Sequence, residues 1–148
     1  MAIAEVNGQR LYYEAIGEGD PLLCVHGLAC DTLAWIPQVQ AFAAAHRTVI
    51  FDNRDVGQSS MAEDGYEIAD MARDALALAD ELDLETFHLL GASMGGAIAQ
   101  EMALAAPERI RTSRSRSRSR RAGHGRARSA PSGAPESTAC PVRSVWTS

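Results

Sequence analysis

Short apolar runs alternate with longer amphipathic segments over the first 110 residues of this 148-residue chain. Residues 21–27 (PLLCVHG) and 47–52 (RTVIFD) are short apolar runs, which are typical of strands buried on both faces of a sheet. Between residues 68 and 82, apolar side chains recur every three or four positions and predict a helix with one buried face and an acidic outer face. The residues on the predicted buried face are Ile68, Met71, Ala72, Ala75, Leu76, Ala79 and Leu82.

The remaining segments complete an alternation of strands and helices. Asn7-Gly8 lies between two β-like runs and predicts a hairpin turn. A helix is expected near residues 33–46, with Pro37 in its first turn or interrupting it. Residues 86–91 (TFHLLG) predict another strand, and residues 95–107 predict a helix that ends at its final proline. Together these segments predict an α/β fold with a mostly parallel sheet and an opening antiparallel hairpin.

The pattern stops after residue 110. Residues 111–148 are rich in Arg, Ser, Gly and Pro and show no apolar periodicity. We therefore expect an α/β domain over residues 1–110 and a disordered tail over residues 111–148. Charge divides the chain at nearly the same place: residues 1–108 hold four arginines and eighteen acidic residues, whereas residues 109–148 hold ten arginines and one glutamate. The formal net charge of −5 averages two regions of opposite sign.

Residues 91–96 (GASMGG) place a serine between a predicted strand and a predicted helix. A serine hydroxyl is a poor nucleophile, so an enzyme that uses one must expose it and stabilise the oxyanion formed on attack. A tight strand-turn-helix elbow would expose Ser93, with Gly91 and Gly95 placed where a side chain would collide with neighbouring elements. The N–H groups at the start of the helix would face the developing negative charge. This segment therefore predicts a nucleophile elbow.

Three motifs, taken in order, make residues 1–110 resemble the N-terminal part of an α/β-hydrolase-fold protein. They are VHGLACDTLAW at residues 25–35, FDNRDVGQSS at residues 51–60 and GASMGG at residues 91–96. Asp55, in the second motif, stands where the family more often has glycine. The departure is mild, because aspartate tolerates left-handed backbone geometry better than most residues.

The resemblance implies a serine hydrolase that acts on a small-molecule ester or lactone through an acyl-enzyme, similar to esterases, enol-lactonases and haloperoxidase-like hydrolases. It implies that Ser93 is the nucleophile and that the backbone N–H groups of Leu28 and Met94 form the oxyanion hole. It implies no metal and no organic cofactor. His26 is expected to be structural rather than catalytic. The residues that the resemblance assigns to motif support are Gly91, Gly95, His26, Gly27, Asp52 and Arg54.

The other catalytic groups of the family do not follow in the expected way. The family order is serine, then an acidic residue, then histidine. No aspartate follows Ser93 in this sequence. The later glutamates and the later histidine are Glu101, Glu108, Glu136 and His124. Without a positioned imidazole to accept the serine proton, we expect this truncated chain to be catalytically incomplete.

Two hypotheses for residues 111–148 remain open. In the first, the Arg-Ser repeat binds RNA or partner proteins, and the chain is a non-enzymatic interaction module. In the second, a frameshift occurs near residues 111–113. If Ser-Arg is encoded as TCG-CGC, another frame reads CTC-GCG, a Leu-Ala repeat suited to the next buried strand. The coding sequence decides between these hypotheses.

Smaller observations bear on partners and location. The three cysteines lack metal-ligand spacing, and Cys24 is expected to be a small buried residue. No signal-peptide pattern or long apolar run is present, which favours a cytoplasmic location. We expect a small-molecule substrate and neither nucleic acid nor a membrane as a partner. If no strand pairs beyond residues 86–91, the free sheet edge favours self-association.

Overall fold

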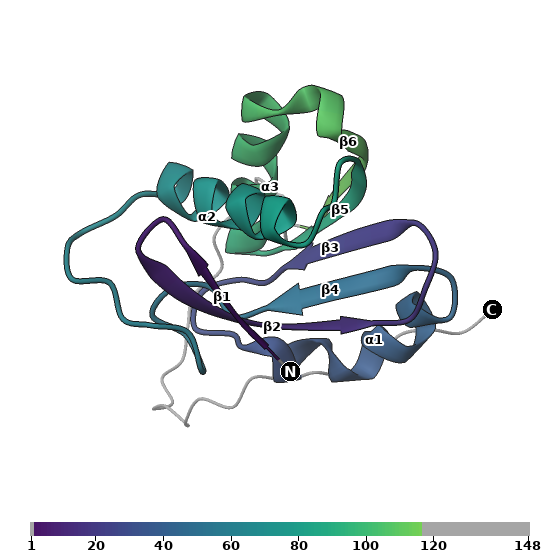
Figure 1. The fold of residues 1–148 in the computed structure, drawn as a ribbon, viewed down its shortest axis with the longest axis horizontal. Coiled ribbons are helices and arrows are strands. Elements are labelled where there is room, and N and C mark those ends of the chain that lie inside the picture. The colour runs from purple at the N-terminus through teal and green to yellow at the C-terminus, as the bar shows by residue number, and fades with distance from the viewer. Residues whose placement is uncertain (1, 117–148) are drawn as a thin grey trace, which may run out of the picture.

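A computed structural model describes residues 2–116 and shows, within them, a six-stranded sheet in the order β1-β2-β4-β3-β5-β6 (Figure 1). β1 and β2 form an antiparallel hairpin, β2 pairs antiparallel with β4, and the remaining neighbours are parallel. The predicted fold class, with its opening hairpin, is confirmed. The strands are β1 (Ala2–Val6), β2 (Gln9–Ile16), β3 (Pro21–Val25), β4 (Arg47–Phe51), β5 (Phe87–Ala92) and β6 (Ile110–Arg116).

Helices cover both faces of the sheet, because successive strand side chains point to opposite faces and both sets are apolar. Leu23 and Val25 contribute to the core beside α2 and α3, whereas Leu22 and Cys24 pack with α1 residues on the other face. Pro37 lies in the first turn of α1, where its missing N–H is tolerated. No helix in this part of the chain is long and apolar enough to cross a membrane. The helices are η1 (Thr32–Trp35), α1 (Ile36–Ala43), α2 (Ile68–Glu81), α3 (Met94–Ala105) and η2 (Pro107–Arg109).

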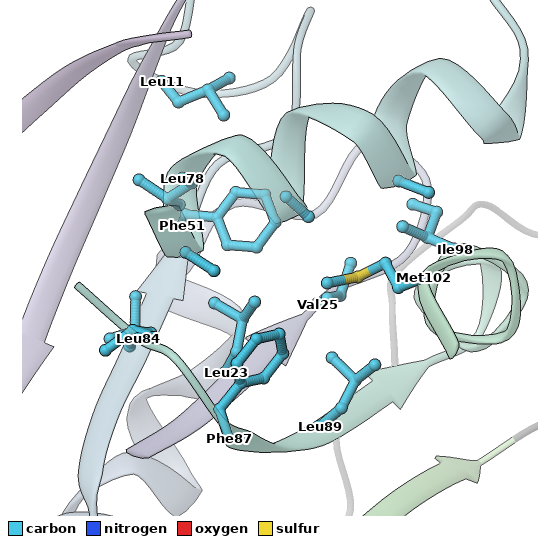
Figure 2. Packing of buried hydrophobic residues seen from close by; sticks show 14 of the residues in the cluster. Leu11, Leu23, Val25, Phe51, Leu78, Leu84, Phe87, Leu89, Ile98 and Met102 are labelled. Atoms are coloured by element: carbon cyan, nitrogen blue, oxygen red, sulfur yellow. The ribbon is translucent and has the colours of Figure 1, made fainter. Parts of the chain in front are cut away.

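The larger core lies between the sheet and the helices α2 and α3 (Figure 2). Phe51 and Phe87 from the sheet meet Met102 from α3 within this core, and all three are almost completely buried. The predicted buried face of α2 is confirmed for five of its seven residues, Met71, Ala72, Ala75, Ala79 and Leu82. Leu78 is fully buried although it was not predicted, and Ile68 and Leu76 are only partly buried. α3 packs beside α2 and covers a face that the sheet alone would leave open.

The predicted start of the disordered tail is wrong, because residues 110–116 form β6. This strand pairs in parallel with β5, with Thr112 opposite His88 and Arg114 opposite Leu90. Backbone hydrogen bonds in a ladder need no particular side chain, so an Arg-Ser repeat can form them without apolar periodicity. The expected free edge at residues 86–91 is wrong for the same reason. Residues 117–148, which hold the rest of the predicted tail, lie outside the described residues.

Two arginines hold the start of β6 against neighbouring loops. Arg109 forms an ion pair with Asp80 at 2.6 Å and donates a hydrogen bond to the carbonyl oxygen of Leu84 at 2.9 Å. Arg111 forms an ion pair with Asp20 at 2.9 Å. The basic segment therefore contacts acidic residues of the domain that precedes it.

Candidate active site

Ser93 lies at the junction between β5, which ends at Ala92, and α3, which begins at Met94. Its φ is 56° and its ψ is −123°, a conformation that residues other than glycine seldom adopt. Such backbone strain persists only where the surrounding structure enforces it, and it concentrates at functional sites. The residue is exposed. The bend therefore presents a hydroxyl at the carboxyl end of the parallel strands, where α/β sheets bind ligands.

Two glycines allow this bend to form against β3. A Cβ on Gly95 would collide with the carbonyl oxygens of Val25 and His26. A Cβ on Gly91 would collide with the carbonyl oxygen of Gly95. These obstacles are backbone atoms, which no side-chain rotation can move. The glycines on either side of Ser93 therefore let the helix begin directly beside the end of β3.

The segment after β3 lies against Ser93. A Cβ on Gly27 would be 2.9 Å from Ser93 Cβ and 3.2 Å from Ser93 Oγ. Leu28, the first predicted oxyanion donor, follows Gly27 directly, and Met94, the second, is the first residue of α3. N–H groups in the first turn of a helix have no acceptor within that helix. Met94 therefore follows the serine directly along the chain, and Gly27, the residue before Leu28, contacts the serine.

Asp52 and Asn53 attach the loop after β4 to the segment after β3. The Asp52 carboxylate is buried and accepts hydrogen bonds from the backbone N–H of Thr32 at 2.6 Å and of Gln58 at 2.9 Å. Asn53 donates from Nδ2 to the carbonyl oxygen of His26 at 3.1 Å. The carboxylate of Asp52 is thus occupied by two backbone donors, and the contact of Asn53 was not anticipated from the sequence.

Arg54 joins the same loop to α2. Its Nε and one terminal nitrogen each lie 2.7 Å from Asp74 Oδ2, and its guanidinium lies 4.9 Å from the ring centroid of Tyr66. Burial raises the pKa of the Asp74 carboxyl, and hydrogen bonds from Arg54 and Asn7 oppose that rise. The sequence pattern predicted a solvated face for the acidic residues of α2. Asp74 departs from that pattern and is buried as the partner of Arg54.

Asp55 has a φ of 64°, so the position that favours glycine in the family is left-handed here as well. Its Oδ1 accepts a hydrogen bond from the backbone N–H of Ala62 at 2.6 Å. A hydrogen bond from Tyr66 is the largest cause that lowers the pKa of this carboxyl. The aspartate therefore supplies loop contacts that a glycine would lack.

His26 is half-buried and packs edge-to-face on Trp35, with ring centroids 4.9 Å apart. Its Nδ1 accepts a hydrogen bond from the backbone N–H of Gly27 at 2.7 Å, which places the proton of the neutral ring on Nε2. Burial lowers the pKa of the ring, although Asp31 opposes this. These contacts support the structural role expected of His26.

The other two described histidines lie away from Ser93. Nδ1 of His46 lies 3.2 Å from the carbonyl oxygen of Asp20. Nδ1 of His88, near the start of β5, lies 2.7 Å from Thr112 Oγ1. Both lie near the amino-terminal ends of the parallel strands, whereas Ser93 follows the carboxyl end of β5, so neither of these two imidazoles is placed beside the serine. The same residues contain no group of three or more His, Cys, Asp or Glu side chains placed to hold a metal ion.

The chain belongs to the alpha/beta hydrolase fold family, whose match spans residues 20–113. It is 38% identical over 112 residues to the protein named carbamate hydrolase RutD of Azorhizobium caulinodans, a match that covers 76% of this chain and 42% of that protein. It is 40% identical over 103 residues to the protein named non-heme bromoperoxidase BpoC of Mycobacterium tuberculosis, a match that covers 68% and 39%, respectively.

A solved structure gives the same result for the fold. The enol-lactonase of Burkholderia xenovorans LB400 matches with a TM-score of 0.74 and 30% identity, over 76% of this chain and 45% of that chain. This chain therefore spans less than half the length of each of these three proteins. It shares its fold with hydrolases and lactonases, which establishes a hydrolase family.

Proposed function

We propose that this chain carries the nucleophile side of a serine hydrolase site that acts on a small-molecule ester or lactone. The observation that carries the proposal is the strained bend at Ser93, which exposes a hydroxyl beside Gly27 and at the start of α3. The similarity to an enol-lactonase and to other hydrolases supports the substrate class. A small-molecule ester or lactone carbonyl, placed between the serine and the two backbone amides, would have its oxygen facing both donors.

The reaction that fits this geometry is acyl transfer to water. Ser93 Oγ attacks the carbonyl carbon, a base accepts the hydroxyl proton, and the carbonyl oxygen becomes an oxyanion. The N–H groups of Leu28 and Met94 donate to that oxyanion, a contribution typically of about 10²–10³ in rate for each donor removed. The alcohol oxygen then leaves with a proton, and water hydrolyses the acyl-enzyme. The described residues supply the nucleophile and the donors.

Residues 2–116 place no base beside Ser93 for the first step. The neutral ring of His26 carries its proton on Nε2, and His46 and His88 lie at the amino-terminal ends of strands β4 and β5, away from Ser93. No aspartate follows Ser93 in the sequence. A positioned general base contributes typically about 10²–10⁴ in rate. We therefore propose that the chain by itself is a slow hydrolase at best.

A cytoplasmic location stays a prediction.

A fluorophosphonate probe tests the nucleophile. We expect slow labelling of the full chain, no labelling of Ser93→Ala, and faster labelling of the Azorhizobium relative as a reference. His124→Ala should label at the rate of the unmodified chain, because His124 is assigned no role. Labelling that persists in Ser93→Ala would contradict the nucleophile. If the unmodified chain were labelled as fast as the reference, the proposal that it lacks a positioned base would be contradicted.

The Arg-Ser hypothesis has a separate test, which does not involve Ser93. Salt-sensitive RNA binding that survives deletion of residues 1–108 would support an interaction module. Our proposal predicts weak binding without sequence preference, which is the behaviour expected of any segment with ten arginines. Tight RNA binding at physiological salt would replace the hydrolase proposal for this chain.

A further inference from the structure

Two histidines from distant segments meet at the end of the sheet opposite Ser93. His46 directly precedes β4, and His88 lies near the start of β5, so both are at the end where the parallel strands begin (Figure 1). Their ring centroids are 5.4 Å apart, and the ring planes are inclined at 64°. Both residues are only partly buried, so an ion from solvent can reach them. We call His46 and His88 the histidine pair.

The ring of His46 has its Nδ1 committed to the backbone. Nδ1 lies 3.2 Å from the carbonyl oxygen of Asp20. A carbonyl oxygen only accepts, so this contact is a hydrogen bond when Nδ1 carries the proton. In the neutral ring, Nε2 then keeps its lone pair. The contact therefore selects the form of His46 that can bind a metal ion through Nε2.

The ring of His88 has a matching arrangement on the neighbouring strand. Its Nδ1 lies 2.7 Å from Thr112 Oγ1, and Thr112 is the residue of β6 that pairs with His88 in the ladder. A hydroxyl oxygen can accept from Nδ1, which leaves Nε2 of His88 with its lone pair. Histidines that bind metals almost always donate their other ring N–H to an acceptor of the protein or to water. Both rings of the pair have such an acceptor.

The spacing of the two rings suits a single ion. A zinc–nitrogen bond is about 2.0–2.1 Å long and the ring centroid lies about 1.2 Å behind the nitrogen, so two imidazoles on a tetrahedral ion have centroids about 5.2 Å apart. The observed 5.4 Å is close to that value. Since residues 2–116 contain no group of three or more side chains placed to hold a metal, the pair would supply two ligands and water the others.

The ligand type selects the class of ion. Imidazole nitrogen suits zinc, copper and nickel, whereas magnesium and calcium prefer oxygen ligands. A site with two imidazoles and positions open to water is therefore specific for a transition metal. Zinc and magnesium are both divalent, so comparing them separates binding by imidazole from attraction to the acidic surface of the domain.

We propose that the histidine pair binds one divalent transition-metal ion, such as zinc, through Nε2 of His46 and Nε2 of His88. The ion joins the segment between α1 and β4 to β5, and through Thr112 it also favours the pairing of β6. The site lies at the opposite end of the sheet from Ser93. It therefore stands independently of the proposed hydrolase function.

Titration of the full chain with zinc chloride tests the site. We expect isothermal titration calorimetry to give one ion per chain. A ligand that binds only the folded chain raises its melting temperature, here by at least about 3 °C at a zinc concentration well above the dissociation constant. His46→Gln and His88→Gln should each abolish both effects and keep the circular dichroism spectrum of the metal-free parent. Magnesium chloride should produce neither effect.

Three further variants locate the ligands. His124→Gln and Cys140→Ser remove candidate ligands outside the described residues and should bind zinc as the parent does. Thr112→Val keeps a β-branched side chain in β6 but removes the acceptor for Nδ1 of His88. Loss of such an acceptor typically weakens metal binding by about 10–100-fold, and we expect a rise of that size in the dissociation constant. Nitrogen-15 spectra of the histidine rings should show zinc on Nε2 of both.

The outcomes are distinct. Absence of zinc binding by the parent chain overturns the proposal, and so does binding that survives both histidine substitutions. Loss of binding in His124→Gln or Cys140→Ser places the ion elsewhere and also overturns it. An equal response to magnesium excludes imidazole as the ligand. An unchanged dissociation constant in Thr112→Val would contradict ligation through Nε2 of His88.

Discussion

The neighbouring strands β5 and β6 are stabilised in different ways. β5 carries Phe87 and Leu89, which are almost fully buried in the core, and pairs with strands on both sides. β6 carries exposed polar and charged residues from position 111 to 115 and pairs on one side only within the described sheet. β5 is therefore held by apolar burial, and β6 is held by its backbone ladder and by arginine contacts. Two strands with the same parallel pairing are thus stabilised by different interactions.

This difference matters for the site, because Ser93 depends on the buried side. The bend is enclosed by β3, β5 and α3, and the loop that braces β3 is anchored through the buried pair Arg54–Asp74. β6 touches α3 at Gly96, where a Cβ would lie 3.2 Å from Ser115 Cβ. We expect the bend to persist when β6 is perturbed and to fail when the buried side is perturbed.

The largest expected effect is Phe87→Ala. Phe87 has no exposed area, and truncation of a buried phenylalanine typically costs about 3–5 kcal/mol in the free energy of unfolding. Thr112→Ala in β6 is the matched control and should cost less than about 1 kcal/mol. Urea unfolding monitored by circular dichroism measures both. Equal losses would remove the distinction between the two strands.

Arg54→Ala should follow, with a loss of about 3 kcal/mol, because it leaves the Asp74 carboxylate buried without its cation. Since burial already raises the pKa of Asp74, the variant should lose less stability at pH 5 than at pH 7, where the carboxyl must stay charged. Arg54→Ala combined with Asp74→Ala should recover part of the loss. A loss that does not change with pH or with the second substitution would contradict the buried pair.

The variants Gly95→Ala and Gly96→Ala compare two sides of α3, one against the backbone after β3 and the other against a side chain of β6. The added Cβ meets the backbone of β3 at Gly95 and the side chain of Ser115 at Gly96. Alanine gains about 1 kcal/mol in a helix interior, but overpacking against backbone costs about 1–3 kcal/mol or more. We expect Gly95→Ala to be destabilised by about 2 kcal/mol and Gly96→Ala to be near neutral. Thermal unfolding measures both variants. A Gly96→Ala loss as large as that of Gly95→Ala would show that β6 does not shift to accommodate the added methyl group.

A smaller effect is expected from pH through His26. Burial lowers the pKa of His26 in the folded chain below the ordinary 6.5, so the unfolded chain binds the extra proton first as the pH falls. Its contribution to stability is therefore complete above pH 6.5 and is lost as the pH falls through the folded-state value. His26→Gln should show a shallower dependence on pH over this range, measured by urea unfolding. An unchanged dependence would assign the effect to other groups.

Arg111→Ala should have the smallest effect. Arg111 and Asp20 are 46% and 61% exposed at their side chains, and exposed ion pairs typically contribute about 0–1 kcal/mol. The loss should shrink further in high salt, which screens exposed charges. Hydrogen exchange of β6 amides is the most sensitive measurement. A loss above about 2 kcal/mol would mean that the arginine contacts, rather than the backbone ladder, hold β6 in place.

Residue patterns predicted the parts of the fold that depend on burial or on a required backbone shape. The hairpin at Asn7-Gly8, the strand and helix on either side of Ser93 and most of the buried face of α2 followed from local periodicity or turn chemistry. β6 was missed because it has no apolar alternation, and a strand held by its neighbour's backbone leaves no such pattern. The burial of Asp74 was missed as well, because it depends on the ion pair with Arg54, a residue from another segment of the chain.

The sequence alone determined which residues stand at the bend, because glycine and small residues are required wherever backbone atoms approach closely. It also determined the opposite charges of the two halves of the chain. Only the tertiary structure decided that Gly27 lies against Ser93, that Asp52 and Arg54 brace the loop from opposite ends, and that residues 110–116 extend the sheet. These contacts join segments distant in sequence, and their energies depend on packing that no local pattern encodes.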